Sequence, residues 1–269
     1  MAVPPESRFI TELDPGDSDV EVDSFLRRLA AHKRFTAWGL PIAAVGTELR
    51  GLERTSYATA ITAVYRAYAR RQGKARWGDK TPRYVEHIPE ISRLWPDARF
   101  IHLIRDGRDV ALSYADVDFG PKNVAKAAKL WADRVGAGLR DGRPLGDRYL
   151  EVLYADLTED TEGTLRDICS LIDLDFDPVM LDPEATGKAA LDRAQRYNPH
   201  VREGAKRHVR SWESDMPADQ QEMFEAVAGD VLSALAFERR YQTTSAPARV
   251  KARLALKGIP FGRLHSTRG

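Results

Sequence analysis

The spacing of apolar residues divides this chain into a helical first third and a longer part in which strands and helices alternate. Apolar positions three and four residues apart predict amphipathic helices over residues 22–35 and 57–71. Beyond them, short apolar runs typical of buried strands alternate with further helical periodicity. Strands are predicted at 75–77, 99–104 and 149–154, and helices at 85–95, 108–114, 123–139, 160–172 and 217–237.

This alternation sets the expected fold class. Strands that are separated by helices indicate parallel pairing through crossover connections. We therefore expect an α/β fold, a three-layer sandwich around a parallel sheet. One domain is expected over residues 1–241, followed by a basic tail over 242–269. The stretch 177–198, rich in proline and polar residues, is the one long irregular connection.

Composition is consistent with this expected fold and adds predictions about the core and the cellular compartment. An apolar fraction of 43% over 269 residues is enough for a substantial core. The single cysteine, Cys169, lies in an apolar run with helical spacing, which predicts a buried thiol and a reducing compartment. No stretch approaches the roughly 20 apolar residues of a membrane span, and residues 1–14 lack a signal pattern. We expect a cytoplasmic protein.

Basic charge gathers at the end of the chain. Residues 245–269 contain six basic residues and no acidic one, although the formal net charge of the whole chain is +1. A solvated end is the favoured interpretation, and peripheral contact with an anionic membrane is the alternative. We expect no nucleic-acid partner.

Candidate chemistry concentrates in residues 99–114, RFIHLIRDGRDVALSY. An apolar strand stops at Arg105, Asp106 can cap the next helix, and Gly107 lets the backbone approach a ligand. Parallel sheets bind ligands beyond the carboxyl ends of their strands, where a helix presents free N–H groups. An arginine fork beside the hydroxyl of Ser113 suits a phosphate monoester. The alternative is that the charged residues of this segment form a surface cluster without a ligand.

The same segment resembles the 3′-phosphate-binding motif of sulfotransferases that use 3′-phosphoadenosine 5′-phosphosulfate. Residues 77–82, WGDKTP, and the strand ending at Tyr154 are similar to flanking stretches of protein-tyrosine, glycosaminoglycan and related bacterial sulfotransferases. The resemblance places Arg105, Ser113 and Tyr154 on the 3′-phosphate of the donor. It makes Lys80 the cation that stabilises the leaving group. A salt-bridged surface lysine and a half-buried strand-end tyrosine are the alternatives.

A later stretch, KRHVRSW at residues 206–212, resembles the loop that closes over the nucleotide in this family. Basic groups with an interleaved aromatic residue can hold a phosphate and an adenine together. The resemblance, in a loose register, adds four residues to the donor site: Arg207, Arg210, Ser211 and Trp212. An exposed basic loop without a ligand is the alternative.

The start of the chain, PPESRFI at residues 4–10, resembles the Glu-Glu-Thr-Arg-Val-Ile segment of protein-tyrosine sulfotransferases. Glu6 falls on the position of the general base, and Arg8 on the arginine two residues later, on the substrate side. A carboxylate within reach of an acceptor hydroxyl can take its proton as the oxygen attacks sulfur. The acceptor class stays open between a sugar, a lipid, a metabolite and a peptide tyrosine.

The resemblance implies a P-loop-NTPase-like fold. In that fold an N-terminal strand and loop cradle the 5′-phosphosulfate, and this sequence does not contain them. We expect a natural chain that starts upstream of Met1. The alternatives are a truncated, inactive homologue or a module that binds adenosine bisphosphate, with a nucleotide or sugar kinase less favoured. The histidine spacings contain no metal-binding pair, so no metal is expected.

Overall fold

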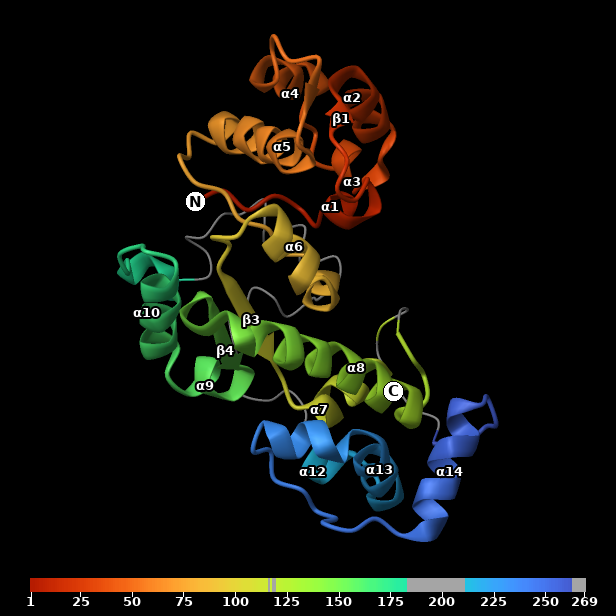
Figure 1. The fold of residues 1–269 in the computed structure, drawn as a ribbon. Helices are drawn as coiled ribbons and strands as arrows, with labels where there is room; N and C mark the ends of the chain where they lie inside the picture. The colour runs from red at the N-terminus through yellow and green to blue at the C-terminus, as the bar shows by residue number, and fades with distance from the viewer. Residues whose placement is uncertain (116, 118–119, 183–210, 263–269) are drawn as a thin grey trace. The chain divides into compact units, whose positions relative to one another are not determined.

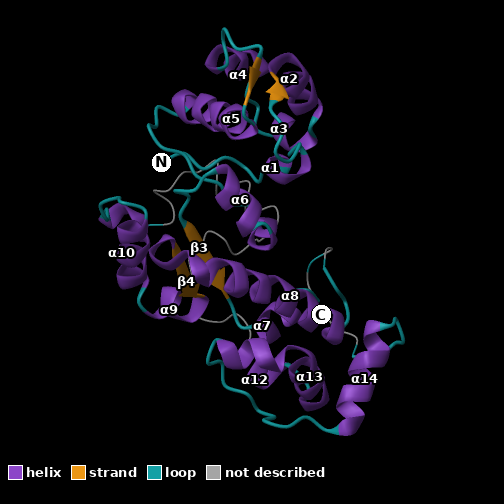
Figure 2. Cartoon of the chain, in the orientation of Figure 1, coloured by secondary structure: helices purple, strands orange, loops and turns teal. Residues whose placement is uncertain are grey.

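The computed structural model describes residues 1–115, 117, 120–182 and 211–262. The chain divides into two compact units, residues 1–98 (unit 1) and residues 99–269 (unit 2). Figures 1 and 2 show that both are dominated by helices. In the part of the chain that is described, no helix is long and apolar enough to cross a membrane.

Unit 1 consists of short helices around one longer helix (Figure 1). The predicted helix at 57–71 is confirmed, whereas the helix predicted at 22–35 is broken at His32, whose ring nitrogen caps the second piece. The predicted strand at 75–77 is reduced to a single parallel bridge between Trp77 and Ala2. The elements are α1 (Phe9–Glu12), β1 (Val20–Glu21), α2 (Val22–Ala31), α3 (Lys33–Thr36), α4 (Ile42–Glu48), β2 (Arg54–Thr55), α5 (Tyr57–Arg71), the 3₁₀ helix η1 (Pro82–Glu86) and α6 (Ile88–Leu94).

Aromatic side chains form much of the core of unit 1. The ring of Phe9, fully buried in α1, lies 5.1 Å from Trp38 between centroids. Tyr65 of α5 stacks on Trp77 at 4.5 Å. Such pairs stabilise a core beyond the area that they bury. The residues just before α1 are thereby attached to a well-packed body.

Unit 2 contains the parallel pair that the alternating pattern predicted. Strands β3 (Phe100–Ile104) and β4 (Tyr149–Leu153) pair in parallel, with Phe100 opposite Tyr149. The connection between them contains α7 (Gly107–Ser113), α8 (Val124–Gly142) and the 3₁₀ helix η2 (Arg143–Arg148). The larger three-layer sandwich stays a prediction. After β4 come α9 (Tyr154–Glu159), α10 (Thr161–Leu171), η3 (Pro178–Leu181), α12 (Trp212–Asp215), α13 (Ala218–Ala234) and α14 (Ala246–Leu256).

The core of unit 2 lies between α8 and α13, and it extends to helix α14, which the sequence did not predict. Three alanines of α14, Ala248, Ala252 and Ala255, are buried, and the helix packs on α13 and α8. Small residues four and three apart allow a close approach of helix backbones. The basic segment that begins at residue 245 is therefore packed over this helix, not wholly solvated. Cys169 of α10 is buried, as predicted.

Candidate functional site

Two segments far apart in the sequence, residues 2–10 and 76–84, bring Glu6 and Lys80 together in unit 1. The Nζ atom of Lys80 donates a hydrogen bond to Oε1 of Glu6 over 2.9 Å. The side chain of Lys80 is 69% exposed and that of Glu6 32%, so both groups are accessible. The sequence assigned a base and a leaving-group cation separately. The structure places the two in direct contact.

A buried set of hydroxyl groups lies directly behind this pair. The backbone N–H of Ser7 donates to Oγ1 of Thr81 over 2.9 Å, and the Ser7 hydroxyl lies 2.7 Å from the hydroxyl of Tyr84. The Tyr84 oxygen also accepts the N–H of Ile10 over 3.2 Å. Desolvation by burial raises the pKa of Tyr84, which keeps the phenol neutral. Sequence reasoning missed these residues; only the position of Thr81 beside Lys80 could have marked one of them.

A carboxylate adds a charge to this buried set. The hydroxyl of Tyr65 donates to Oδ2 of Asp79 over 2.5 Å. Desolvation by burial raises the pKa of Asp79, and hydrogen bonds from Tyr65 and Thr81 oppose the rise. Asp79 precedes Lys80 and Thr81 follows it, so Lys80 lies between two residues whose side chains are held by hydrogen bonds. The backbone around Lys80 is fixed from both sides.

Arg8, the predicted substrate-side arginine, has a strained backbone. Its φ of 57° is in the left-handed region, which costs a residue with a Cβ atom about 1 kcal/mol or more. Its Nε atom is buried and has no hydrogen-bond partner within the described residues. Strain of this kind persists where the surrounding contacts over-determine the backbone. Arg8 therefore offers a donor next to Glu6 without a mobile backbone.

In unit 2, helix α7 begins as the sequence predicted. Asp106 caps the helix, because its carboxylate accepts the N–H of Arg108 over 2.8 Å. Gly107, expected to let the backbone approach a ligand, instead meets two aromatic rings. A Cβ atom at this position would lie 2.4 Å from Trp131 and 2.6 Å from Phe224. Close packing within the protein is the reason for this glycine.

The contact at Gly107 yields a stability prediction. Gly107→Ala should lower the free energy of unfolding by about 1–3 kcal/mol, because two ring systems must move to admit one methyl group. Gly136→Ala in α8 is the matched control, since its Cβ atom would meet Val231 at an ordinary 3.8 Å. Alanine should stabilise that helix by up to about 1 kcal/mol. Urea unfolding measures both, and equal midpoints for the two variants would contradict the packing argument.

Arg105 and Tyr154, both predicted to contact the 3′-phosphate, lie close together. The Arg105 guanidinium carbon is 5.4 Å from the centroid of the Tyr154 ring. Its Nη2 atom lies 3.7 Å from Oδ2 of Asp109, and its buried Nε has no hydrogen-bond partner in the described part of the chain. Tyr154 opens helix α9 and does not end a strand. Ser113, at the end of α7, donates its hydroxyl to the carbonyl of Val110 over 2.7 Å.

Arg108 is the centre of a buried ionic cluster. Its side chain is 1% exposed and donates to Glu225 over 3.0 Å and to Asp106 over 2.7 Å. The side chain of Glu225 is fully buried, and Asp109 is 2% exposed. Buried charges persist in proteins where they are paired and hydrogen-bonded. The surface-cluster alternative is therefore wrong for Arg108 and Asp109.

The ionic cluster also fixes Trp212. The Arg108 guanidinium carbon lies 3.4 Å from the centroid of the Trp212 ring, and the backbone N–H of Trp212 donates to Oδ1 of Asp109 over 2.9 Å. Ser211 caps α12 through its hydroxyl. These contacts join the start of α12 to α7. Arg207 and Arg210, the other two predicted residues of this loop, lie outside the described residues.

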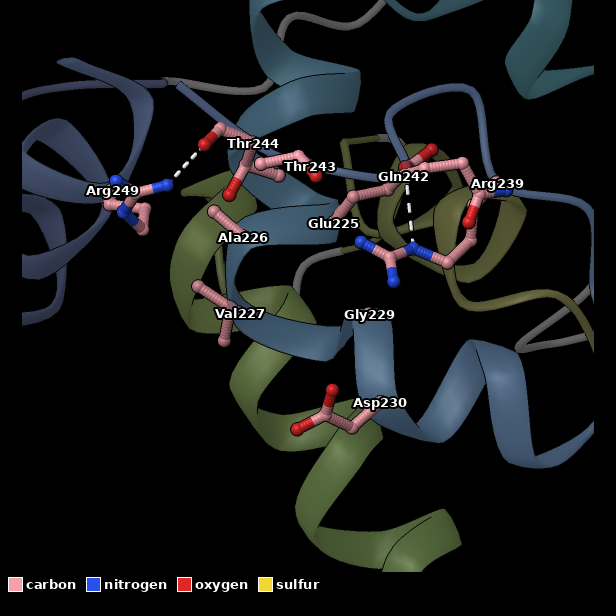
Figure 3. Close-up of a pocket in the computed structure, with 10 residues that line it drawn as sticks. All are labelled: Glu225, Ala226, Val227, Gly229, Asp230, Arg239, Gln242, Thr243, Thr244 and Arg249. Atoms are coloured by element: carbon pink, nitrogen blue, oxygen red, sulfur yellow. Dashed lines mark hydrogen bonds and ion pairs between the residues drawn. The ribbon is translucent and has the colours of Figure 1, made fainter. Parts of the chain in front are cut away.

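Two cavities lie in unit 2, and only the smaller contains a predicted residue. A cavity of about 180 Å³ is lined by Trp212, Glu213, Glu238 and Arg240. A larger one, of about 290 Å³, lies between α13 and residues 239–249. In the larger cavity the Arg239 guanidinium lies beside the Glu225 carboxylate, and Arg249 donates to the carbonyl of Thr244 (Figure 3). Of these two cavities, the smaller is therefore the one that bears on the predicted donor site.

A cation and two aromatic side chains gather around the start of α7. Arg105 supplies the cation, Tyr154 a phenol and Trp212 an indole. Across the described ranges, no group of three or more His, Cys, Asp or Glu side chains is arranged to hold a metal. A phosphate-bearing nucleotide fits the cation and the aromatic rings.

Comparison with known proteins agrees with the motifs. A model of the sulfotransferase family matches residues 4–178. This chain belongs to the sulfotransferase family. The matched stretch contains candidate residues of each unit, from Glu6 to Tyr154.

A solved structure shows the same fold relationship. The chain is similar to a "Sulfotransferase Domain from the Curacin Biosynthetic Pathway", with a TM-score of 0.53 and 15% identity over 88% of each chain. At this identity the likeness concerns the fold. No protein with a curated description matches the sequence.

Proposed function

We propose that this protein transfers a sulfuryl group from 3′-phosphoadenosine 5′-phosphosulfate to an acceptor hydroxyl. The observation that carries the proposal is the contact of 2.9 Å between Glu6 and Lys80 in a chain of the sulfotransferase family. Transfer between two oxygens needs a base for the incoming hydroxyl and positive charge for the departing oxygen. The two groups come from different segments, and both are accessible to solvent.

In this mechanism Glu6 takes the proton of the acceptor hydroxyl as its oxygen attacks sulfur. The bond from sulfur to the bridging oxygen of the donor breaks, and Lys80 donates a hydrogen bond to that oxygen as it gains negative charge. In the free protein Lys80 donates to Glu6. Substrate binding then exchanges one hydrogen bond for two: hydroxyl to Glu6, and Lys80 to the donor.

The donor's 3′-phosphate is assigned to unit 2. Arg105 has a buried Nε atom without a partner within the described part of unit 2, and a phosphate oxygen would satisfy it. Tyr154 and Ser113 are the proposed neighbours of this phosphate. Trp212, with one ring face against Arg108, lines the cavity that would receive the nucleotide base. The flanking residues of the same loop are assigned to the donor as well: Arg207, Arg210 and Ser211.

The rest of the proposal concerns the setting of the reaction. The acceptor is a hydroxyl of a sugar, a lipid, a metabolite or a peptide tyrosine, with Arg8 on its side of the site. We place the protein in the cytoplasm and the transferase domain at residues 1–241, in the three-layer, P-loop-like fold of the family. No metal takes part in the proposed steps, because Lys80 and Arg105 supply the positive charge.

A binding measurement tests the donor assignment. Calorimetry should show that adenosine 3′,5′-bisphosphate binds more tightly than ATP. Arg105→Ala should weaken bisphosphate binding about 10- to 100-fold, because a charged hydrogen-bond pair is lost. Arg99→Ala is the matched control: this arginine, in the same unit, is 34% exposed against 32% for Arg105, and it pairs with Asp173. It should bind the bisphosphate like the wild type.

Three results would contradict the proposed donor, the phosphate site at Arg105 or the transfer reaction. Preferential binding of ATP would exclude the proposed donor. An equal loss in Arg99→Ala would mean that general positive charge, not a phosphate site at Arg105, holds the ligand. Tight bisphosphate binding without transfer of ³⁵S-labelled sulfate would favour a binding module over a transferase.

A further inference from the structure

Glu6 and Lys80 come together because two segments, residues 2–10 and 76–84, lie side by side. Several contacts join residues 74 positions apart, and others join residues 75 to 77 positions apart, including the Ala2–Trp77 bridge and the hydroxyl pair of Ser7 and Tyr84. Glu6 and Lys80 are exposed to solvent, whereas the residues that follow them, Ser7 and Thr81, are buried. The placement of the exposed pair therefore depends on the buried pair beside it. The contacts at the spacing of 74 positions are Ala2 N–H to Arg76 carbonyl, Glu6 to Lys80, Ser7 to Thr81 and Ile10 to Tyr84.

We propose that Ser7 and Tyr84 are positioning residues that hold the Glu6 carboxylate against the Lys80 ammonium. Ser7 is completely buried, and both its N–H and its hydroxyl are engaged by segment 76–84. It therefore fixes the backbone on which Glu6 is carried. The inference rests on the proposed function for its catalytic meaning, but the geometry that it asserts can be measured without any reaction.

Tyr84 holds the base segment on both sides of its strained residue. Its hydroxyl contacts the Ser7 hydroxyl before Arg8 and accepts the N–H of Ile10 after it. One phenol oxygen thus contacts the chain on both sides of Arg8, whose φ is 57°. Removing that oxygen lets the backbone at Arg8 relax toward an ordinary conformation. Glu6 would then shift away from Lys80.

Tyr57 provides a control variant that should lower the stability of unit 1 but leave the position of Glu6 unchanged. It is 3% exposed, against 8% for Tyr84, and its hydroxyl donates to the carbonyls of Phe9 and Ile10 over 2.8 and 3.0 Å. It holds the same short helix α1, yet these two hydrogen bonds reach only residues after Arg8. Tyr57→Phe should therefore destabilise unit 1 to a similar degree and leave Glu6 opposite Lys80.

The first experiment measures the rate at which acetic anhydride labels Lys80, followed by mass spectrometry of the full chain. Glu6→Gln gives the labelling rate of Lys80 without its carboxylate partner. We expect that rate to be about 3-fold faster than in the wild type, because an exposed ion pair protects the amine only weakly. Tyr84→Phe and Ser7→Ala should approach that rate. Tyr57→Phe should label like the wild type. Wild-type labelling in Tyr84→Phe would overturn the proposal whether or not the protein transfers sulfate.

The second experiment measures transfer of labelled sulfate to 4-nitrophenol as the probe acceptor. Tyr84→Phe should lower kcat about 10-fold with an unchanged KM for the donor, because a misplaced base slows the chemical step. In a protein that already contains Glu6→Gln, Tyr84→Phe should not lower kcat any further. An equal fall in Tyr57→Phe would overturn the positioning role. Faster labelling of Lys80 in Tyr84→Phe, with no transfer by the wild type, would support the positioning and reject the proposed function.

Discussion

Replacing Lys80 with methionine is expected to lower the rate of sulfuryl transfer by about 100- to 1,000-fold, the range observed when a preorganised donor is removed from developing negative charge. Methionine has nearly the length of lysine and removes its charge. The folded state should be little affected, because the Lys80 side chain is 69% exposed and an exposed ion pair contributes little to stability. The effect should therefore fall on kcat.

The matched control for this prediction is Lys74→Met. Lys74 is also exposed and lies in the same unit, six positions earlier. Initial rates with labelled donor, together with urea unfolding midpoints, separate catalysis from stability. A transfer rate that falls equally in both variants would show that bulk positive charge, not the Lys80 ammonium, supports the reaction. Full activity of Lys80→Met would remove Lys80 from the mechanism.

Replacing Arg108 with methionine is expected to lower the free energy of unfolding by about 3–5 kcal/mol, since removing one partner of a buried ion pair leaves the other uncompensated. Glu225 has no exposed side-chain surface, and Asp106 is 12% exposed. Both carboxylates would lose the guanidinium that faces them, and Glu225 would keep, among the described cations, only Arg239, whose Nε atom is 3.7 Å away. The variant also removes the cation that lies 3.4 Å from the ring of Trp212.

Arg140→Met is the control for Arg108→Met, because Arg140 pairs with Asp141 while 69% exposed. The same substitution there should leave the unfolding midpoint close to that of the wild type, because an exposed ion pair contributes little to stability. Urea unfolding monitored by circular dichroism compares the two. Similar midpoints would mean that the cluster around Arg108 contributes no more than a surface pair.

Local patterns carried most of what the sequence could predict. Residues 57–71 show helical spacing along their whole length, and α5 has those bounds. The strand and helix on either side of Asp106 were predicted with their cap, because each signal is complete within a few residues. Helix α14 was missed because its buried face is made of alanines and its basic residues dominate the composition.

Long-range partners account for what the sequence could not show. Arg108 resembles any surface arginine until Glu225, 117 positions later, is placed beside it. The roles of Glu6 and Lys80 came from resemblance to a family, not from periodicity, and their contact spans 74 positions. Hydroxyl groups such as those of Ser7 and Tyr84 form a network only after the fold has brought them inside. A pattern read along one segment contains none of this information.

The separation of 74 positions between Glu6 and Lys80 also has a consequence for biosynthesis. A ribosome releases Glu6 long before Lys80, so Glu6 waits without its partner while α2 to α5 are made. Closing so long a loop in an open chain carries an entropic cost, which falls once the intervening helices have folded and shortened the distance. The pair should therefore form late, and a nascent chain arrested before Tyr84 would lack it even with α5 complete.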